Sequence, residues 1–262
     1  MLAIEALDDV TRVVMSTRTT RAIGYSVSAY LVRGVLVDLG FAAVGREVAA
    51  YLDHAQPRGV ILTHHHEDHA GNVELAVRGG LPLAASDATL AALRAAPPLD
   101  TYRRITWGTP PRLVSAVRPF VCDALCLVPA PGHSHDHHVV WDAERETLFG
   151  GDLFLGIKVR IAHEGEDPRR LVASLRAAAA LHPRRLFDAH RGLVRDPVDA
   201  LLAKAEWMEE TMHAIEARIH RGWSDRAITR DVLGREPLEH HVSRGKLSKI
   251  NFVRAVRAGI HR

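Results

Sequence analysis

The hydrophobic positions in the first two-thirds of the chain fall into short apolar runs separated by amphipathic stretches. Short apolar runs bounded by glycine or polar residues are typical of strands, and apolar residues three and four apart are typical of helices. Their alternation predicts an α/β architecture. The predicted strands cover 29–32 and 35–38 (a hairpin), 59–63, 81–85, 124–128, 138–141, 147–150 and 184–189. The predicted helices cover 70–78, a stretch from the Ser86 cap to Arg94, and a stretch that begins at Pro168, with a loop over 97–111.

Beyond about residue 197 the pattern predicts helices only. The first, over 198–221, carries one continuous apolar stripe, and two shorter helices follow it up to Gly259. We therefore predict a main domain over 1–197 and a C-terminal helical extension over 198–262. The stripe is expected to pack on the core, and the alternative is a homodimer through helix 198–221.

Composition narrows the class of protein. Of the 262 residues 47% are hydrophobic and 25% are charged, and no apolar run approaches the ~20 residues that a membrane span needs. The first ten residues lack the basic and apolar regions of a signal peptide. We expect a cytoplasmic protein with no membrane contact. The two cysteines, Cys122 and Cys126, lie in an apolar stretch and are expected to be buried thiols, not a disulfide framework.

Histidine changes the picture, because eight of the 17 histidines fall into two short clusters. The first is the segment HHHEDH, which directly follows the predicted strand 59–63. Histidine is the commonest metal ligand among side chains, and further donors, His133, Asp152 and His190, follow turns or strand ends elsewhere. One loop with several donors, joined by these others, could hold two adjacent metal ions.

The same residues resemble the motifs of the metallo-β-lactamase superfamily. HHHEDH fits its H-x-H-x-D-H motif, and Asp38 in VLVDLG, His133 in PAPGH, Asp152 in GGD and His190 in FDAHRG look like its other motifs, in the same order. The resemblance covers about residues 25–195. It implies an αβ/βα four-layer sandwich with a metal site at one edge of the two sheets.

The resemblance also implies a role for each of these residues. His64, His66 and His133 would bind one metal ion, Asp68, His69 and His190 would bind a second, and Asp152 would bridge the two. Asp38 would order the ligand loop without binding metal itself. The all-His/Asp set is that of the glyoxalase II-like branch. The expected cofactors are two divalent ions, zinc by preference, with iron or manganese as alternatives.

The expected activity is hydrolysis of a small ester, thioester or lactone by a metal-bridged hydroxide that the catalytic carboxylates Asp68 and Asp152 orient. His65 and Glu67, between the ligand positions, are expected to be exposed or to support the ligands, and His137 either supports the site or lies in a solvated loop. The candidate substrate contacts lie in predicted loops. They are Trp107, Phe154, Lys158 and Arg191.

Two alternative functions stay open. Residues 201–262 hold 12 Lys and Arg against 8 Asp and Glu, so this basic helical extension could contact nucleic acid in a nuclease or phosphodiesterase, although a solvated basic face is the commoner cause of such a bias. The other alternative is a mononuclear iron persulfide dioxygenase, which would use the equivalents of His64, His66 and His133.

Overall fold

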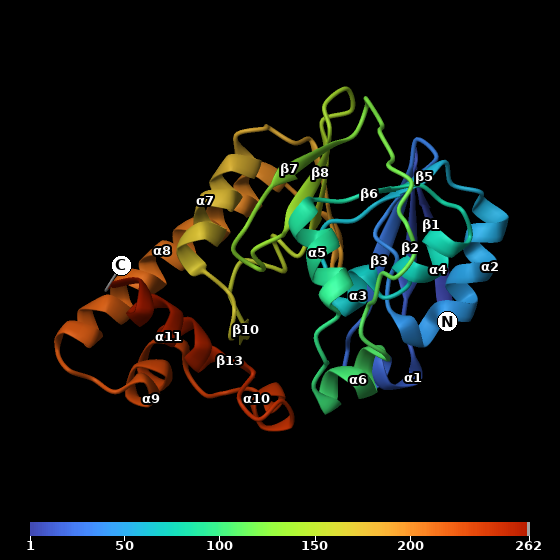
Figure 1. Ribbon diagram of the computed structural model, residues 1–262. Helices are drawn as coiled ribbons and strands as arrows, with labels where there is room; N and C mark the ends of the chain where they lie inside the picture. The colour runs from blue at the N-terminus through green and yellow to red at the C-terminus, as the bar shows by residue number, and fades with distance from the viewer. Residues whose placement is uncertain (261–262) are drawn as a thin grey trace. The chain divides into compact units, whose positions relative to one another are not determined.

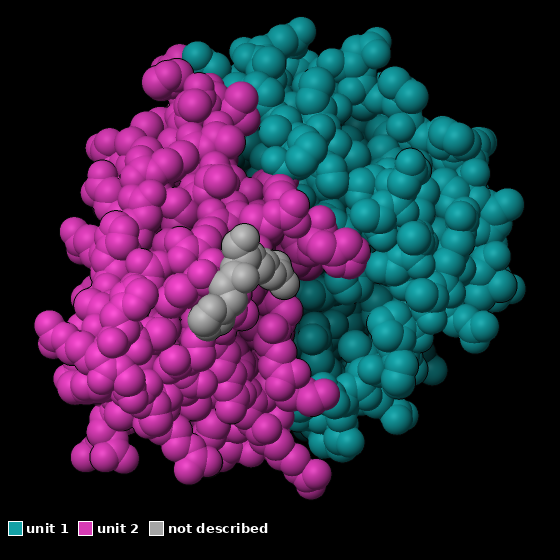
Figure 2. Space-filling view, turned by 60° about the vertical axis from the view of Figure 1, so that its left-hand side comes forward, with its two compact units in different colours: residues 1–129, 136–152, 185–194 teal, residues 130–135, 153–184, 195–262 magenta. Residues whose placement is uncertain are grey.

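The computed structural model describes residues 1–260 and divides into two compact units, which Figure 2 colours separately. The first unit contains residues 1–129, 136–152 and 185–194. The second contains residues 130–135, 153–184 and the chain from 195 onward. Residues 261–262, which include the last basic residue of the extension, lie outside the described residues. The predicted domain boundary at residue 197 stays a prediction.

A six-stranded mixed sheet forms the first part of the first unit (Figure 1). Its strands follow one another in sequence order. They are β1 (Leu2–Leu7), β2 (Val10–Met15), β3 (Val27–Val32), β4 (Val35–Val37), β5 (Gly59–Ile61) and β6 (Leu83–Ala84). Neighbours from β1 to β4 are antiparallel, and β4, β5 and β6 are parallel. The carboxyl ends of β4 and β5 therefore lie at the same edge of the sheet.

The second sheet of this unit has five strands in the order β12-β11-β9-β8-β7. They are β7 (Cys126–Pro129), β8 (His138–Asp142), β9 (Thr147–Gly151), β11 (Arg185–Asp188) and β12 (Gly192–Val194). Strands β9 and β11 are parallel, whereas β8 is antiparallel to β9. The ends of β9 and β11 thus share an edge with the start of β8.

The two sheets pack face to face, and both faces of the first sheet are buried. Side chains alternate between the two faces of a strand, and in β3 Ala29 contributes to one apolar cluster while Tyr30 contributes to the other. Tyr30 packs between the two sheets, with ring centroids 5.6 Å from Phe149 and 5.2 Å from Phe187. Each fully buried aromatic ring of this kind contributes about 1.5–3 kcal/mol relative to an exposed one.

The outer face of the first sheet is covered by helices of the same unit (Figure 1). These are α2 (Gly45–Ala55), α4 (Val73–Arg78) and α5 (Asp87–Ala95). Ser86 caps α5 as predicted, since its hydroxyl accepts from the Thr89 N–H. The unit also contains α1 (Arg18–Ala22), the 3-10 turn η1 (Ala42–Val44), α3 (Glu67–Ala70) and α6 (Thr101–Trp107).

The structure corrects two of the expectations and adds one hairpin. The stretch 97–111 is not all loop, because α6 lies within it. The hairpin of β1 and β2 was not predicted; most side chains of β1 are exposed, so its sequence lacks a buried strand's pattern. Cys126 is exposed, not buried, because β7 is an edge strand, and Cys122 is half-buried; both thiols are free.

The second unit is mainly helical. Its elements are β10 (Ala162–His163), α7 (Pro168–Ala179), α8 (Pro197–His220), α9 (Asp225–Ile228), the π-helical turn η2 (Thr229–Leu233), α10 (Leu238–Val242), β13 (Leu247–Ser248) and α11 (Lys249–Ile260). Asp167 caps α7, with Pro168 in its first turn, as predicted.

Helix α8 packs against α7, and ion pairs such as Arg176 with Glu209 and Arg169 with Glu216 join the two. The predicted apolar stripe of α8 is buried at Leu201, Met208 and Ile215. A homodimer through this helix stays a prediction. Among residues 1–260, no helix combines the length and the apolar character that crossing a membrane requires.

Candidate metal centre

The carboxyl ends of β4, β5, β9 and β11 carry the site, and hydrogen bonds join the two sheets there. The His138 N–H, at the start of β8, donates to the Thr63 carbonyl after β5 at 2.9 Å. The Ser28 N–H in β3 donates to the Ala189 carbonyl after β11 at 2.7 Å. These bonds fix the loops that follow β5 and β11 within one unit.

The described residues contain two groups of potential metal ligands, and the donor atoms of each group lie within 4.8 Å of one another. One group lies wholly in the first unit. It consists of Asp68, His69, Asp152 and His190. The other group shares Asp152 with the first. It consists of His64, His66, His133 and Asp152.

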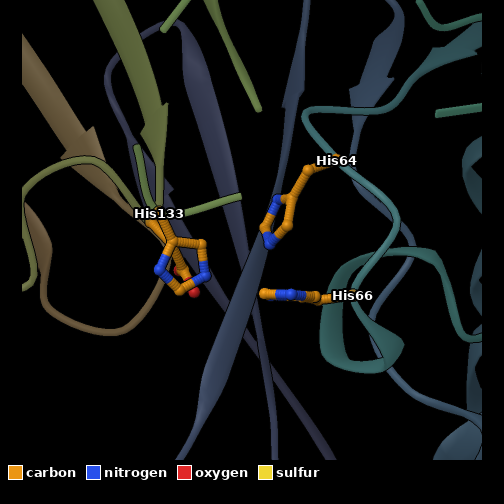
Figure 3. Close-up of side chains that lie close together, drawn as sticks. His64, His66 and His133 are labelled. Carbon is orange, nitrogen blue, oxygen red and sulfur yellow. The ribbon is translucent and has the colours of Figure 1, made fainter. Parts of the chain in front are cut away.

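Figure 3 draws the three histidines of the second group, and the rings of His64 and His66 turn toward the same space. His133 belongs to segment 130–135 of the second unit, and this segment joins the first unit covalently at both of its ends. Its Nδ1 lies 3.0 Å from Glu166 Oε1, in the turn before α7. Sequence reasoning missed Glu166, which is 33 residues away.

Hydrogen bonds fix the orientation of the two histidines in the first group. His69 Nδ1 lies 2.8 Å from Asp38 Oδ2, and His190 Nδ1 lies 2.7 Å from the Ser26 carbonyl. Both partners are acceptors, so both Nδ1 atoms donate and both Nε2 atoms face the other way. The His69 Nε2 lies 3.2 Å from Asp152 Oδ1, and the His190 Nε2 lies 3.4 Å from one oxygen each of Asp68 and Asp152.

A proton or a metal ion is needed between these Nε2 atoms and the carboxylates, because a nitrogen lone pair and a carboxylate oxygen repel each other. Burial disfavours charge on His69 and His190, but the neighbouring carboxylates outweigh it and raise the pKa of both imidazoles well above the usual value. In the described residues, the buried Nε2 of His69 meets no hydrogen-bond donor or acceptor in bonding geometry. These donor atoms fit a divalent cation, which would replace the protons.

His64 lies in a different electrostatic environment. Complete burial, reinforced by the neighbouring histidines, lowers the pKa of His64 well below the usual value. The imidazole is therefore neutral at physiological pH. A neutral imidazole is the form that binds a metal ion.

Asp38 orders the ligand loop from the end of β4. Its carboxylate accepts from the Thr63 N–H at 2.8 Å and from the Thr63 hydroxyl at 2.9 Å, besides His69 Nδ1. Its backbone has a φ of 62°, in the left-handed region that Asp tolerates better than most residues. Asp38 therefore holds both the loop and the ring orientation of His69.

Two residues directly before β8, Asp136 and His137, support the loops that carry His65 and Asp152. The sequence did not single out Asp136, and it left the role of His137 open. Asp136 Oδ2 accepts from the His65 N–H at 2.9 Å and from the Thr89 hydroxyl at 2.9 Å. His137 is buried, and its Nε2 accepts from the Asp152 N–H at 3.0 Å. Of the two alternatives for His137, the structure shows the supporting contact. His65 is half-buried.

The turn that carries His190 has its own support. Asp188 Oδ1 accepts from the N–H groups of His190 and Arg191, both at 2.8 Å. The Asp188 carbonyl accepts from the Tyr30 hydroxyl at 2.7 Å. Asp188 lies in the FDAHRG segment of the sequence. The motif alone did not show that Asp188 holds the turn while His190 is the candidate metal ligand.

Glu67 is buried and paired, which sequence reasoning had left open. Arg103, from α6, donates through Nε and Nη2 to both carboxylate oxygens of Glu67, at 2.5 and 2.6 Å. The Glu67 side chain is 2% exposed and that of Arg103 is 19% exposed. Arg103 therefore binds α6 to the short helix α3, which carries Asp68 and His69.

The predicted substrate contacts lie in different environments. Trp107 is the last residue of α6, and its ring makes an edge contact with the Phe41 ring, with the ring centroids 5.0 Å apart. Arg191 is exposed in the turn after β11, and Lys158 is exposed in the second unit. Phe154 is buried, and its carbonyl accepts from Lys204 Nζ. Their contact with substrate stays a prediction.

Comparison with known proteins places the chain in a family. The family model described as "Metallo-beta-lactamase superfamily" matches residues 22–206. A hydroxyacylglutathione hydrolase of Xylella fastidiosa is 30% identical over 191 residues, covering 69% of this chain and 67% of that enzyme. "Beta-lactamase-like protein 2 homolog" of Drosophila melanogaster is 28% identical over 173 residues, 63% of this chain and 57% of its own length. The match thus spans little more than half of the Drosophila protein.

The fold is shared with a solved metallo-beta-lactamase family protein of Thermus thermophilus. Its TM-score is 0.68 at 16% identity, and the match covers 97% of this chain and 94% of that one. The predicted αβ/βα sandwich is therefore confirmed. With the family model matching most of the chain, this protein belongs to the metallo-beta-lactamase superfamily.

Proposed function

We propose that the protein hydrolyses a small thioester at a centre of two divalent metal ions. The observation that carries the proposal is the sharing of Asp152 by two groups of potential ligands. Two ions that share a carboxylate lie close enough to act on one bond together. The donors are only nitrogen and oxygen atoms, a set that suits zinc, and also iron or manganese.

In this proposal His64, His66 and His133 hold one ion, and Asp68, His69 and His190 hold the other. Asp152 contributes to both. When bound, the ions supply a hydroxide at neutral pH and polarise the carbonyl of the substrate. The assignment is supported by the neutral state of His64 and by the two Nε2 atoms that face carboxylates.

The chain's own residues position this chemistry. Asp68 and Asp152 bring negative charge that offsets the cations and orients the attacking water. Asp38 and the Ser26 carbonyl hold the rings of His69 and His190, so little reorganisation is needed when substrate binds. No serine or cysteine nucleophile is required.

The thioester is chosen over an ester or lactone because of the relatives. Enzymes named hydroxyacylglutathione hydrolase match at 30% identity over about two-thirds of their length. A basic, exposed residue beside the centre, Arg191, is proposed to contact the acidic part of the substrate. Trp107, Phe154 and Lys158 are proposed as further contacts.

The test uses the metal-loaded full chain with three matched substrates: an S-2-hydroxyacylglutathione thioester, the corresponding oxygen ester, and a lactone. The proposal expects turnover of the thioester with the highest kcat/KM of the three. His190→Asn should lower kcat by at least about a hundredfold, whereas His54→Asn, at an exposed position of α2, should not change it. Absence of thioester turnover, or equal turnover by His190→Asn, would contradict the proposal.

A further inference from the structure

A cavity of about 750 Å³ lies wholly within the second unit, among α9, η2, α10 and α11. Five arginines line it: Arg226, Arg230, Arg235, Arg244 and Arg254. Two histidines of α10, His240 and His241, also belong to its wall. The five come from α9, the turn η2, the connections on either side of α10, and α11. Their convergence on one space is therefore a tertiary feature, not a charge run in the sequence.

Four of the cavity arginines have no carboxylate partner among the described residues. Several arginines elsewhere in this unit do have one, as in Arg176 with Glu209, Arg218 with Asp231 and Arg257 with Asp225. Among residues 1–260, no carboxylate lies within 4.0 Å of Arg226, Arg230, Arg235 or Arg244. The fifth, Arg254, lies 4.0 Å from Asp225. Positive charge thus exceeds negative charge around this space, because five arginines line it against two glutamates.

The two acidic residues of the wall, Glu164 and Glu236, offset only part of this charge. Glu236 uses both carboxylate oxygens at the start of α11, where it accepts from the Ser248 hydroxyl at 2.7 Å and from the N–H groups of Lys249 and Ile250 at 2.9 and 3.0 Å. Glu164 is exposed. Like charges gathered at one place disfavour the compact state. A bound anion would therefore reduce the repulsion among the cavity arginines.

The geometry points to a phosphorylated ligand of nucleotide size as the occupant of this cavity, and we propose that it binds there. The guanidinium group is planar and presents paired N–H donors that match phosphate oxygens. A volume of about 750 Å³ falls in the range of small-molecule sites, about 300–1,000 Å³. The phosphate groups can belong to a free nucleotide or to the backbone of a nucleic-acid strand, and the test separates these sources.

The test measures binding of two probes to the full chain: ADP by calorimetry, and a fluorescein-labelled single-stranded RNA of about 12 nucleotides by anisotropy, at low salt. Arg230→Gln/Arg244→Gln removes two cavity charges. Arg170→Gln/Arg221→Gln is the matched control, because both residues are exposed, lie outside the cavity wall and carry the same total charge. The melting temperature of each variant checks that it is folded.

We expect the cavity variant to bind the phosphorylated probe at least about tenfold more weakly than the wild type, and the control variant to bind it equally well. An effect on ADP identifies a free nucleotide as the source, and an effect on RNA alone identifies a nucleic-acid strand. The proposal is wrong if neither probe binds the wild type, if both variants weaken binding equally, or if citrate binds as tightly as ADP. The measurement needs no turnover, so it is independent of the thioester proposal.

Discussion

Replacing Arg103 with methionine removes the cationic partner of Glu67 and keeps a side chain of similar length. Glu67 is 2% exposed, and its carboxylate is bound at both oxygens by Arg103. Removal of one partner from a buried ion pair costs about 3–5 kcal/mol, because the other charge is left buried and unpaired. Arg103 is 19% exposed, which lowers the expected loss in the free energy of unfolding to about 2–4 kcal/mol.

The loss should depend on pH in a defined direction. Burial raises the pKa of Glu67 above its usual value, and Arg103 opposes that rise. Without Arg103 the folded-state pKa rises further above the unfolded value. A carboxyl group whose pKa is higher in the folded state than in the unfolded state destabilises the fold at pH values above its folded-state pKa. This destabilisation decreases as the pH falls toward the unfolded-state pKa. The difference between Arg103→Met and wild type should therefore be smaller at about pH 5 than at about pH 7.5.

Guanidinium denaturation of the metal-loaded protein, followed by tryptophan fluorescence, measures this difference. Arg104→Met is the matched control, because Arg104 lies next to Arg103 in α6 and is exposed. It should change stability by less than about 0.5 kcal/mol. If Arg103→Met and Arg104→Met lose the same stability, or if the loss grows at low pH, the assigned role of the ion pair is refuted.

Two further substitutions test the support of the centre. Asp38→Asn should weaken the binding of one metal ion by about 10–100-fold, because the carboxylate that orients His69 is lost; competition with a chromophoric chelator measures this, and the exposed Asp53→Asn should have no effect. Gly151→Ala should cost at least about 1 kcal/mol more than Gly80→Ala, because both positions have positive φ but only at Gly151 would a Cβ meet His137 Nε2, at 2.8 Å. Equal unfolding free energies for the two glycine variants would contradict this.

The residues that could be predicted from the sequence are those that follow strand ends. His64, Asp152 and His190 each come directly after a short apolar run, and the ends of parallel strands meet at one edge of a sheet. Local pattern was therefore sufficient to bring Asp152 and His190 to one edge of the second sheet, whereas His64 follows β5 of the first sheet and was joined to them by the resemblance to metallo-β-lactamase motifs. The burial of α8 along its stripe was also readable, because a 3.6-residue period places those positions on one face.

The supporting contacts could not be predicted because they join distant segments. Arg103 and Glu67 are 36 residues apart, and Asp136 and His65 are 71 residues apart. A charged residue in a helix such as α6 looks the same in the sequence whether it is solvated or paired. The same reason hides the basic cavity, whose arginines are spread over α9, the turn η2, the connections on either side of α10, and α11.

The number of metal ions bound per chain tests the dinuclear centre most directly. Elemental analysis of the purified full chain, after dialysis against each metal in turn, gives this number. The structure predicts two divalent ions per chain for the wild type and fewer for Asp152→Ala, since Asp152 belongs to both ligand groups. A single redox-active iron per chain, or no bound metal, would contradict the dinuclear centre.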